Sequence, residues 1–408
     1  MRHAPRRDDV SGATPARHTH ARRWRHAPTR SALVARLLPA CHASPADYRS
    51  VTRADTDTGG SRIGREVRRL ALQCAAFVVT GCLLATSKPS VNASQSGRRE
   101  LAASANAPGI TLVLVTLDGV RWHEVFEGVD AELARTHGLS PSEVVSAEAL
   151  TPSLHQILAT HGVALGAPGH GAPIRASGPN FVSLPGYAEL LSGRRVTGCR
   201  DNQCTGGGES TIIDELAALS PGEPGQVVAF TSWPDIAKVA SGRGPLQEPA
   251  PRPRGFRADA LTADLALDYL RLHSPRFLFL GLGEPDEFGH QNDYAGYLRA
   301  VRAADRRIAE IDAELQRLAA RGQRTALFVT ADHGRADSFV EHGAQFPESA
   351  RVWLIAAGSA LSSRGFVAAP RERHLADLAP TLRALAGLPR DTDSRAGNPL
   401  SELLADAR

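Results

Sequence analysis

The sequence has 408 residues, which is enough for one large α/β domain or for two average domains. Hydrophobic residues make up 42% of it and allow a sizeable core. The charge is uneven, because residues 1–69 hold 15 Arg and six acidic residues, a net +9, while the whole chain carries +4. The remaining residues are therefore net negative, about −5, which argues against a basic nucleic-acid-binding domain.

Residues 1–69 are rich in Arg, His, Ser, Thr, Pro and Gly, and we expect them to form a disordered leader. Two arginines then precede an apolar run, Leu70–Ala85, which is shorter than the ~20 residues of a comfortable membrane span. Basic residues before a short apolar run are typical of a secretory signal. Met1 is the only methionine, and a start encoded at Val67 would give the signal an ordinary length. We therefore hypothesise a misassigned gene start.

The signal is predicted to direct export to the periplasm or the outer surface. Its segment Val79–Cys82 resembles a bacterial lipobox, in which the cysteine is lipidated, so Cys82 is a candidate membrane tether. A chance stretch of small residues is the alternative. Residues 70–108 are accordingly predicted to be signal and linker, and residues 109–408 to be the folded domain.

Cys199 and Cys204 are the only two of the five cysteines that lie beyond the leader and the signal. In an oxidising compartment their C-x4-C spacing favours a short-loop disulfide. A zinc site is the weaker interpretation, because no second pair exists to complete four ligands.

Apolar runs alternate with helical periodicity along the folded part of the chain. This alternation predicts an α/β fold with a mainly parallel central sheet and helices on both faces. No internal repeat is present, and Arg243–Pro253 is predicted to be a loop. In chain order we expect strand Ile110–Thr116, helices Thr151–Leu165 and Ala188–Leu191, strand Val227–Thr231, helix Ala258–Leu272, strand Arg276–Leu282, helix Tyr294–Ala320, strands Thr325–Thr330 and Arg351–Ala356, and helix His374–Leu385.

Acidic and histidine side chains cluster after several predicted strands, where open α/β sheets bind ligands. A lone Asp at such a position is commonly a helix cap, and a lone His is commonly a surface residue. Taken together, carboxylates and imidazoles at one sheet edge suit zinc or a similar divalent ion. The six residues are Asp118, Asp286, His290, Asp332, His333 and His342.

These residues stand in motifs that resemble those of the alkaline phosphatase superfamily. The motifs occur in the family's order and cover about residues 110 to 390; their combination is specific, although no single piece is. The matching segments are Thr116–Arg121 (TLDGVR), Ser183–Gly193 (beginning SLPGY), Glu284–His290 (EPDEFGH), Thr330–Gly334 (TADHG), Glu341–Gly343 (EHG) and His374–Thr381 (HLADLAPT).

The resemblance implies two divalent metal ions, zinc or else manganese or magnesium. It places one ion on Asp286, His290 and His342. It places the other ion on Asp118, Asp332, His333 and the hydroxyl group of Ser183. His374 is a competing third ligand for the first ion, and its other interpretation is a polar residue that opens the last helix.

Ser183 is the nucleophile that the resemblance implies. Two cations ~3.5–4 Å apart can hold the attacking and leaving oxygens of an in-line displacement, and metal coordination can activate a serine hydroxyl. Ser183 also precedes a helix, whose amides favour an anionic phosphoryl group. A capping role is the alternative, and it can coexist with catalysis.

The implied activity is that of a metal-dependent phosphohydrolase acting on a small-molecule phosphate monoester or diester through a phosphoseryl intermediate. A mutase or transferase of the same fold is one alternative, and an inactive metal-binding protein is another. The intact Ser183 counts against the inactive protein.

The sequence departs from two branches of the superfamily. Tyr187 stands where a sulfatase would carry Arg, so sulfatase activity is not expected. Cofactor-independent phosphoglycerate mutases carry a large inserted domain, whereas only about 90 residues separate Gly193 from Asp286 here. Two further residues are candidates for substrate binding. Asn202 is predicted to contact a phosphoryl oxygen or to form a turn, and Arg121 to reach the substrate or to lie at the surface.

Overall fold

The computed structural model describes residues 109–404 except for 196, 205–207, 221–222, 224, 241–254 and 363. The predicted leader, the apolar run with Cys82, the linker and the predicted loop Arg243–Pro253 lie outside the described residues. Within the described part, no helix is long and apolar enough to cross a membrane.

A seven-stranded sheet forms the centre of the described domain, with strand order β4-β5-β1-β6-β8-β2-β9. All neighbouring pairs are parallel except the two that involve β8, so the predicted mainly parallel sheet is confirmed. The strands are β1 (Ile110–Leu117), β2 (Gly162–Leu165), β4 (Val227–Thr231), β5 (Phe277–Leu282), β6 (Arg324–Thr330), β8 (Leu354–Ala357) and β9 (Gly365–Val367).

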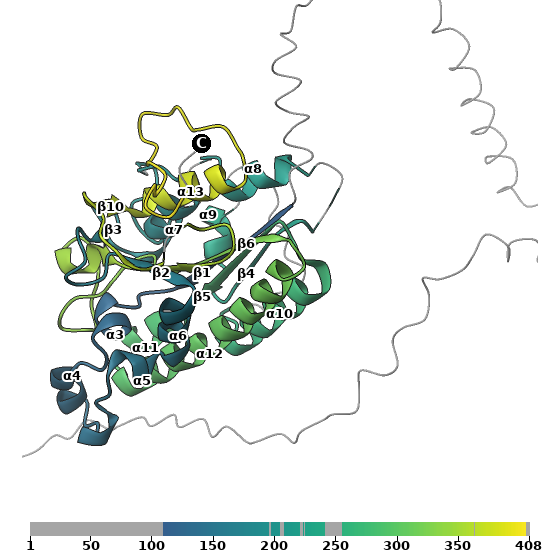
Figure 1. Ribbon diagram of the computed structural model, residues 1–408. Coiled ribbons are helices and arrows are strands. Elements are labelled where there is room, and N and C mark those ends of the chain that lie inside the picture. Colours follow the sequence, from purple (N-terminus) through teal and green to yellow (C-terminus); the bar gives the residue numbers. More distant parts are fainter. Residues whose placement is uncertain are drawn as a thin grey trace, which may run out of the picture. The chain divides into compact units, whose positions relative to one another are not determined.

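Helices cover both faces of this sheet (Figure 1). α6, α10 and α12 pack on one face, and α7, α8, α9 and α13 lie on the other. The helices are α3 (Trp122–Phe126), α4 (Ala131–Thr136), α5 (Ala147–Leu150), α6 (Pro152–Thr160), α7 (Ser183–Ser192), α8 (Ile212–Ala218), α9 (Ile236–Ala240), α10 (Asp259–His273), α11 (Glu284–His290), α12 (Tyr294–Ala319) and α13 (Leu378–Leu385), with 3-10 turns at Pro141–Glu143, Pro347–Ala350 and Leu375–Asp377.

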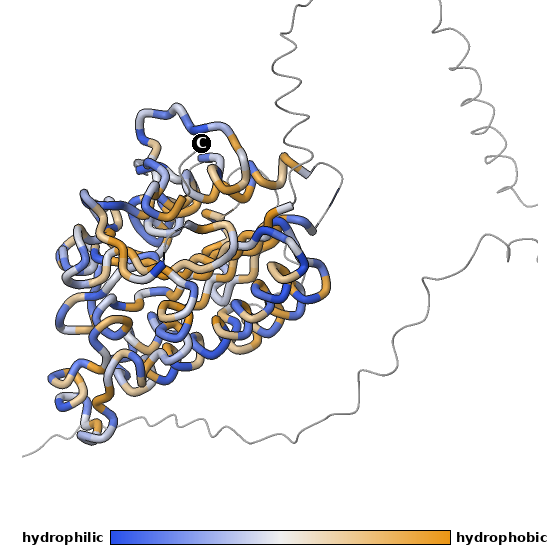
Figure 2. Tube along the Cα trace, viewed as in Figure 1, coloured by the Kyte–Doolittle hydropathy of each residue, from blue (hydrophilic) through white to orange (hydrophobic). Residues whose placement is uncertain are grey.

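The hydrophobic core lies between the sheet and the two helical layers. β1, β4 and β5 are buried along their whole length, which explains why their sequences are continuous apolar runs rather than alternating ones. α12 buries residues at helical spacing, including Val301, Ile308 and Leu315. Figure 2 shows the same division, with hydrophobic colours in the strands and hydrophilic colours along the outer side of α12.

The predicted helix Thr151–Leu165 is wrong in its last third. α6 ends at Thr160, and Gly162–Leu165 forms β2, which pairs with β8 and β9. A Cβ atom at Gly162 would lie 2.8 Å from the Ile157 side chain, so the glycine allows the chain to turn closely over the end of the helix. The apolar run after it is compatible with a helix or a strand, and only sheet pairing decides between them.

The predicted strand Arg351–Ala356 is wrong as a single element, because it divides between two sheets. Arg351–Val352 is β7, and Leu354–Ala357 is β8 of the central sheet. The break is at Trp353, which is fully buried and whose indole Nε1 donates a hydrogen bond to the Val120 carbonyl oxygen at 3.0 Å. β7 instead joins a small three-stranded sheet.

The small sheet has strand order β10-β3-β7 and lies beside the start of the last helix. Its other strands are β3 (Ile174–Arg175) and β10 (Arg373–His374). His374 therefore belongs to a strand, and the predicted helix His374–Leu385 begins later, at Leu378.

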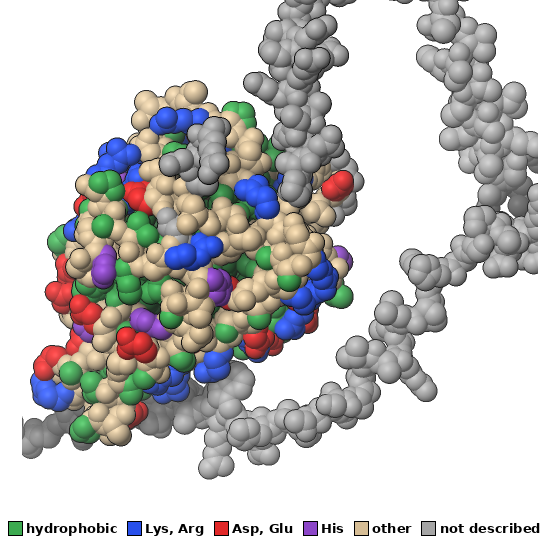
Figure 3. Space-filling view, viewed as in Figure 1, with side chains coloured by type: hydrophobic (Ala, Val, Ile, Leu, Met, Phe, Trp, Pro, Cys, Tyr) green, Lys and Arg blue, Asp and Glu red, His purple; other side chains and the backbone are tan. Residues whose placement is uncertain are grey.

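Acidic and basic side chains are interspersed over the face drawn in Figure 3. This face shows no stripe of basic residues, in line with the net negative charge of residues 70–408. A nucleic-acid-binding surface would concentrate Lys and Arg.

Candidate metal centre

Three neighbouring parallel strands, β5, β1 and β6, end at the same edge of the central sheet. Asp118 follows β1, Asp332 and His333 follow β6, and Asp286 lies in the first turn of α11 after β5. Adjacent strands are ~4.8 Å apart, so side chains from their ends can meet. The structure does bring these predicted residues together.

The inner group consists of Asp118, Asp332 and His333, all of them buried. One potential ligand atom of each residue lies within 4.8 Å of the other two. His333 Nε2 is 3.4 Å from Asp118 Oδ1 and 3.5 Å from Asp332 Oδ2. Two carboxylates and one imidazole at these distances form a set that suits a divalent cation.

The outer group consists of Asp286, His290 and His342. His290 Nε2 lies 3.0 Å from Asp286 Oδ2 and 3.1 Å from His342 Nε2. His342 Nδ1 lies 3.1 Å from the Phe181 carbonyl oxygen and must donate to it, so the neutral ring turns its lone pair at Nε2 toward the group. The rings of His333 and His342 stack at 4.2 Å, and this contact joins the two groups.

The two groups concentrate negative charge in a buried space. Burial raises the pKa of Asp118 and of Asp332, and repulsion from nearby carboxylates adds to both increases. Burial acts to lower the pKa of His333, but the surrounding carboxylates outweigh it and raise that pKa to about 10. Burial and the neighbouring His333 lower the pKa of His342 to about 3. This arrangement favours the binding of positive charge.

One oxygen of the inner group has no hydrogen-bond donor. Gly119 donates its backbone N–H to Asp332 Oδ1 at 3.2 Å, but Asp332 Oδ2 is buried without a hydrogen-bond partner among the described residues. Such an oxygen costs about 1–3 kcal/mol unless something satisfies it. The orphaned oxygen and the carboxylate–imidazole donor set therefore fit bound divalent metal ions.

Ser183 is the first residue of α7 and lies against the inner group. Its Oγ is 3.3 Å from Asp118 Oδ1, to which it donates a hydrogen bond, and 3.2 Å from His333 Nε2. The helix is longer than predicted, because it begins at Ser183 rather than near Ala188. The hydroxyl group thus lies at the N-terminal, positive end of the helix dipole, where an anion is stabilised.

Two glycines allow the backbone to approach closely here. A Cβ atom at Gly186, one turn into α7, would lie 2.3 Å from the Asp332 carbonyl oxygen. A Cβ atom at Gly119, which has φ +64°, would lie 2.4 Å from Asp286 Oδ1. Both glycines therefore set the distances between Ser183, the inner group and Asp286.

Asn202 lies beside the nucleophile, as predicted. Its Oδ1 accepts a hydrogen bond from the Leu184 backbone N–H at 2.9 Å, so it caps α7 from the neighbouring loop. The predicted disulfide between Cys199 and Cys204 is confirmed, and it encloses this asparagine. The contact between Asn202 and a phosphoryl oxygen stays a prediction.

Asn180 connects three segments of the site, and the sequence analysis missed it. Its Nδ2 donates to the Arg200 carbonyl oxygen in the disulfide loop, and its Oδ1 accepts from the Ala344 backbone N–H, both at 2.9 Å. Ala344 follows the loop that carries His342. The only sequence signal was the position of Asn180 three residues before Ser183.

Tyr187 supports the inner group from the same helix as Ser183. It is fully buried, and its hydroxyl group donates to Asp118 Oδ2 at 3.1 Å. Thr116 in turn donates to the Tyr187 hydroxyl oxygen at 3.4 Å. The residue that distinguishes this chain from sulfatases thus has a structural role of its own.

Arg335 is a second residue that the sequence analysis missed. Its guanidinium group is buried and pairs with Asp286 through Nη1. Nε donates to the Phe339 carbonyl oxygen at 2.6 Å and Nη2 to that of Val340 at 2.5 Å. The arginine and the hydrogen bond from His290 hold the pKa of Asp286 well below its usual range, although burial acts to raise it. Its position two residues after His333 was the available signal.

Arg121 is neither at the surface nor directed at the inner group. It is 6% exposed, and its guanidinium group pairs with Glu124 and, at 3.4 Å, with Asp130. The predicted surface role is therefore wrong. Because these carboxylates occupy Arg121, we leave it out of the proposed substrate site.

His374 belongs to neither of the two sets of close ligand atoms among the described residues, Asp118–Asp332–His333 and Asp286–His333–His342. Its Nε2 lies 3.7 Å from a Glu372 carboxylate oxygen. The capping position before the 3-10 turn Leu375–Asp377 agrees with the structural interpretation of this histidine rather than with the competing ligand role.

Comparisons with known proteins agree with this geometry. Residues 257–389 match the family model described as the metalloenzyme superfamily. A 2,3-bisphosphoglycerate-independent phosphoglycerate mutase of Haloarcula marismortui is 30% identical over 143 residues, covering 34% of this chain and 26% of the relative. A phosphopentomutase of Methylorubrum extorquens is 29% identical over 217 residues, covering 51% and 46%. The chain thus spans less than half the length of these curated relatives.

Solved structures share the fold at low sequence identity. A variant of the alkaline phosphatase PafA has a TM-score of 0.51 at 11% identity, covering 73% of this chain and 99% of its own. Murine ectonucleotide pyrophosphatase/phosphodiesterase 5 in complex with AMP has a TM-score of 0.50 at 14% sequence identity, and the match covers 73% of this chain and 100% of that structure. A protein solved with its substrate D-glucosamine-2-N,6-O-disulfate has a TM-score of 0.51 at 13% sequence identity, and the match covers 73% of this chain and 80% of that structure.

Proposed function

We propose, from the premise that this chain belongs to the alkaline phosphatase superfamily, that it is a metal-dependent phosphohydrolase with Ser183 as its nucleophile. The observation that carries the proposal is the position of the Ser183 hydroxyl group. It lies at the start of a helix and 3.2–3.3 Å from two members of the inner group. A serine that served only as a cap would not need those neighbours.

Two divalent ions, proposed to be zinc, would be held by these residues. Asp118, Asp332, His333 and Ser183 would hold the inner ion, and Asp286, His290 and His342 the outer one. When bound, the ions would supply Lewis-acid stabilisation to the attacking and leaving oxygens of the displacement. Manganese or magnesium is the alternative.

The chain's own groups then perform the transfer in two steps. The Ser183 hydroxyl would pass its proton to Asp118, to which it donates a hydrogen bond. Its Oγ then forms a bond to phosphorus as the bond to the ester oxygen breaks, and the leaving oxygen takes a proton from water to give the alcohol. In the second step water attacks phosphorus, the P–Oγ bond breaks and Oγ takes up a proton, which releases phosphate from a monoester substrate or a phosphate monoester from a diester. The positive end of the α7 dipole would stabilise the negative charge on the phosphoryl oxygens. Asn202 is proposed to bind one of those oxygens through its Nδ2.

The segment between the nucleophile helix and Asp286 favours hydrolysis over mutase activity. Its described elements, α8, β4, α9 and α10, belong to the core around the central sheet. Among the described residues there is no separate inserted domain that would cover the site and exclude water. The His290 side chain is 49% exposed, so solvent reaches the outer group. The mutase alternative draws support from the curated relatives, whose matches cover only part of their length.

One assay on purified protein separates these functions. Chromogenic phosphate monoester and diester substrates should be tested side by side, with metal content measured on the same sample. Hydrolysis of either ester, with acid-trapped phosphate on Ser183 detected by mass spectrometry, is expected. Conversion of a sugar phosphate into its positional isomer without release of phosphate would favour the mutase.

We also propose that Leu70–Ala85 directs export and that Cys82 is the lipidation site. The Cys199–Cys204 disulfide supports an oxidising compartment. A periplasmic reporter fused after residue 108 should be active in a bacterial host. A strictly cytosolic reporter would contradict export, and unlabelled protein in a lipid-labelling experiment would contradict lipidation alone.

A further inference from the structure

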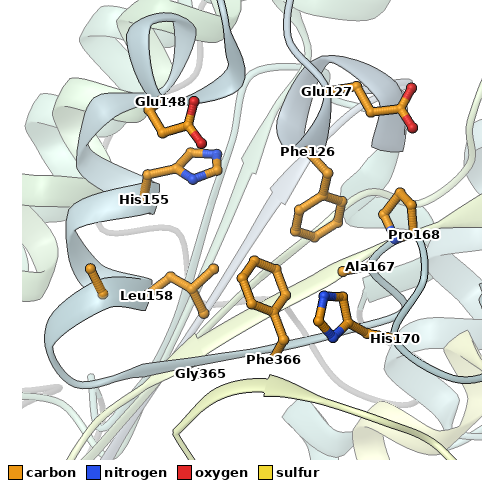
Figure 4. A pocket seen from close by; sticks show the side chains of 11 residues that line it. Phe126, Glu127, Glu148, His155, Leu158, Ala167, Pro168, His170, Gly365 and Phe366 are labelled. Atoms are coloured by element: carbon orange, nitrogen blue, oxygen red, sulfur yellow. The ribbon is translucent and has the colours of Figure 1, made fainter.

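A cavity of about 580 Å³ lies apart from both the inner and the outer group. It is formed at the end of α3, along α5 and α6, in the loop after β2 and at the edge strand β9 (Figure 4). None of its lining residues belongs to the inner or outer group. Its volume lies in the usual range of small-molecule sites. The lining residues are Phe126, Glu127, Glu148, His155, Leu158, Ala159, Ala167, Pro168, His170, Gly365 and Phe366.

Aromatic rings form the floor and one wall of this cavity. Phe366, on β9, keeps 45% of its surface exposed. Its ring stacks on His170 at 4.4 Å, and the Phe126 ring lies at 6.4 Å. Figure 4 shows the two phenylalanines next to each other, with His170 beside Phe366 and with His155 and Leu158 of α6 across from them. The stacking holds Phe366 in place while leaving ring surface for a ligand.

The charged groups around the cavity are carboxylates. Glu127 and Glu148 are the only fully charged side chains in the lining, which contains no Lys or Arg. The Ser146 hydroxyl and a backbone N–H hold the pKa of Glu148 below its usual range, so Glu148 is ionised at neutral pH. Glu127 Oε2 lies 3.2 Å from His123 Nε2, outside the cavity lining.

His155 is fixed beside Glu148. Its Nε2 lies 2.8 Å from the Val125 carbonyl oxygen and donates to it, so a neutral ring presents an unprotonated Nδ1. Figure 4 shows this ring next to the Glu148 carboxylate. Glu148 is therefore the side chain with a negative charge at this end of the cavity.

We propose that this cavity binds a small organic cation, an alkylated or quaternary ammonium group, in the space that Phe126 and Phe366 line on one side and Glu148 and α6 on the other. The faces of aromatic rings are electron-rich and attract cations, most strongly where water is excluded. The carboxylate adds an attraction that a neutral ligand of the same shape does not receive. An anion, including phosphate, would be repelled. The inference does not rest on the phosphohydrolase function, since binding alone tests it.

Tetramethylammonium chloride is the probe, and tert-butanol is its neutral counterpart of similar size. Titration of the full chain by calorimetry or NMR should give saturable binding of the cation, at least about fivefold tighter than that of the alcohol. Potassium chloride at equal ionic strength serves as the salt control. Equal binding of the two probes, or no saturation by the cation, would overturn the proposal.

Two variants locate the binding. Phe366→Leu keeps an apolar side chain but removes the ring, and Glu148→Gln removes the charge; each should weaken tetramethylammonium about three- to tenfold. Phe256→Leu, at a Phe that is 37% exposed outside the cavity, and Glu132→Gln, on α4, are the matched controls and should change nothing. Unchanged affinity in both cavity variants would place the cation elsewhere. If Phe366→Leu fails to fold, Glu148→Gln and the probe comparison still decide.

The cation could be a free molecule or part of an ester substrate. A chromogenic phosphate ester with a trimethylammonium group and its neutral analogue distinguish the two sources. Competition by tetramethylammonium against the cationic ester alone identifies the substrate as the source. Saturable binding without competition identifies a free ligand, and both results support the cavity's preference for cations.

Discussion

The inner and outer groups use similar side chains in different surroundings. The inner residues are at most 3% exposed, whereas the His290 side chain is 49% exposed. Neutral donors, the Tyr187 hydroxyl and the Gly119 backbone N–H, contact the inner carboxylates. In the outer group, by contrast, Asp286 pairs with the guanidinium group of Arg335. The inner carboxylates have only His333 as a basic neighbour, which is itself a potential metal ligand, whereas the outer one is paired with an arginine that cannot bind a metal.

This difference separates two tasks within one centre. The inner group, next to Ser183, is suited to hold its ion tightly and to position the nucleophile. On the proposed function, the outer group, which is exposed at His290 alone and is paired with Arg335, would bind its ion more weakly and meet the substrate's leaving group. We therefore expect changes in the two groups to have different signatures.

The largest effect is expected from Ser183→Ala. Removing the nucleophile should lower kcat by ~10⁴-fold or more, while Asp118, Asp332 and His333 still hold the inner ion. Metal content and melting temperature should stay close to those of the wild type. Kinetics and thermal melts on one preparation check this.

The capping interpretation of Ser183 is wrong, because the N-cap residue of α7 is Val182 and the Ser183 hydroxyl contacts Asp118 and His333 instead of a backbone amide. A purely structural serine would nevertheless make the opposite prediction, a loss of stability with little loss of activity. A variant with near-normal kcat and a lowered melting temperature would falsify the nucleophile assignment and make direct attack by water the mechanism to test.

Metal binding should separate the two groups directly. Protein purified without chelator is expected to hold about two equivalents of divalent metal. Asp332→Asn should lose the inner ion, whereas His290→Ala should retain that ion and lose the outer one. Each ligand loss should exceed the ~10–100-fold change in affinity that follows loss of a supporting hydrogen bond. Less than one equivalent in the zinc-reconstituted wild type would rule out the two-metal centre.

Tyr187→Phe should produce a smaller change that is confined to the inner group. It removes only the hydroxyl group that donates to Asp118, so inner-ion affinity should fall by ~10–100-fold with outer-ion affinity unchanged. Tyr269→Phe, which removes a hydrogen bond to the Gly225 carbonyl oxygen outside the centre, is the matched control. Titration of metal-free protein with zinc measures both affinities, and equal losses in both groups would break the distinction between them.

The smallest effect concerns stability and lies outside both groups. Burial raises the pKa of Glu189 to about 7, although Ser177 and the Ala376 backbone N–H donate to its carboxylate. This folded pKa exceeds the unfolded value near 4.3. The contribution of protonated Glu189 to the free energy of unfolding is therefore greatest below pH 4.3 and is lost as pH rises toward 7. The loss is on the order of 3 kcal/mol.

Glu189→Gln should abolish that pH dependence. Denaturant unfolding of metal-saturated protein between pH 4.5 and 7.5 should show a falling stability for the wild type and a flatter curve for the variant. Identical slopes would assign the pH dependence to other groups, such as the metal ligands.

The sequence was sufficient to predict the sheet and the strand ends that carry the site. β1, β4, β5 and β6 are continuous apolar runs, and such runs identify buried parallel strands. The errors occurred where pairing between distant segments decides the structure. Val163–Leu165 could continue α6 until β8 is there to pair with it, and Trp353 breaks a strand only because it packs at the Val120 carbonyl.

Residues with motif neighbours were found, and residues that act through tertiary contacts were not. Asp118 and His333 could be selected because each follows a strand. Asn180 and Arg335 show their roles only when the loops at Arg200, Ala344 and Asp286 come together. Arg121 was predicted to reach the substrate or to lie at the surface, because its buried partner Glu124 cannot be inferred from spacing alone.

The contact between Gly186 and the Asp332 backbone has a consequence for redesign of this chain. Along α7, we expect the proposed nucleophile to tolerate substitution better than a glycine that has no catalytic role. At residue 183 we expect Cys, which has nearly the size of Ser, to fit without moving the helix, so a new nucleophile could be installed there. Residue 186, which takes part in no chemistry, can accept no side chain at all, because even a methyl group would lie 2.3 Å from a carbonyl oxygen and push the helix off its support. Libraries that aim at new reactivity should therefore vary residue 183 and keep Gly186 constant.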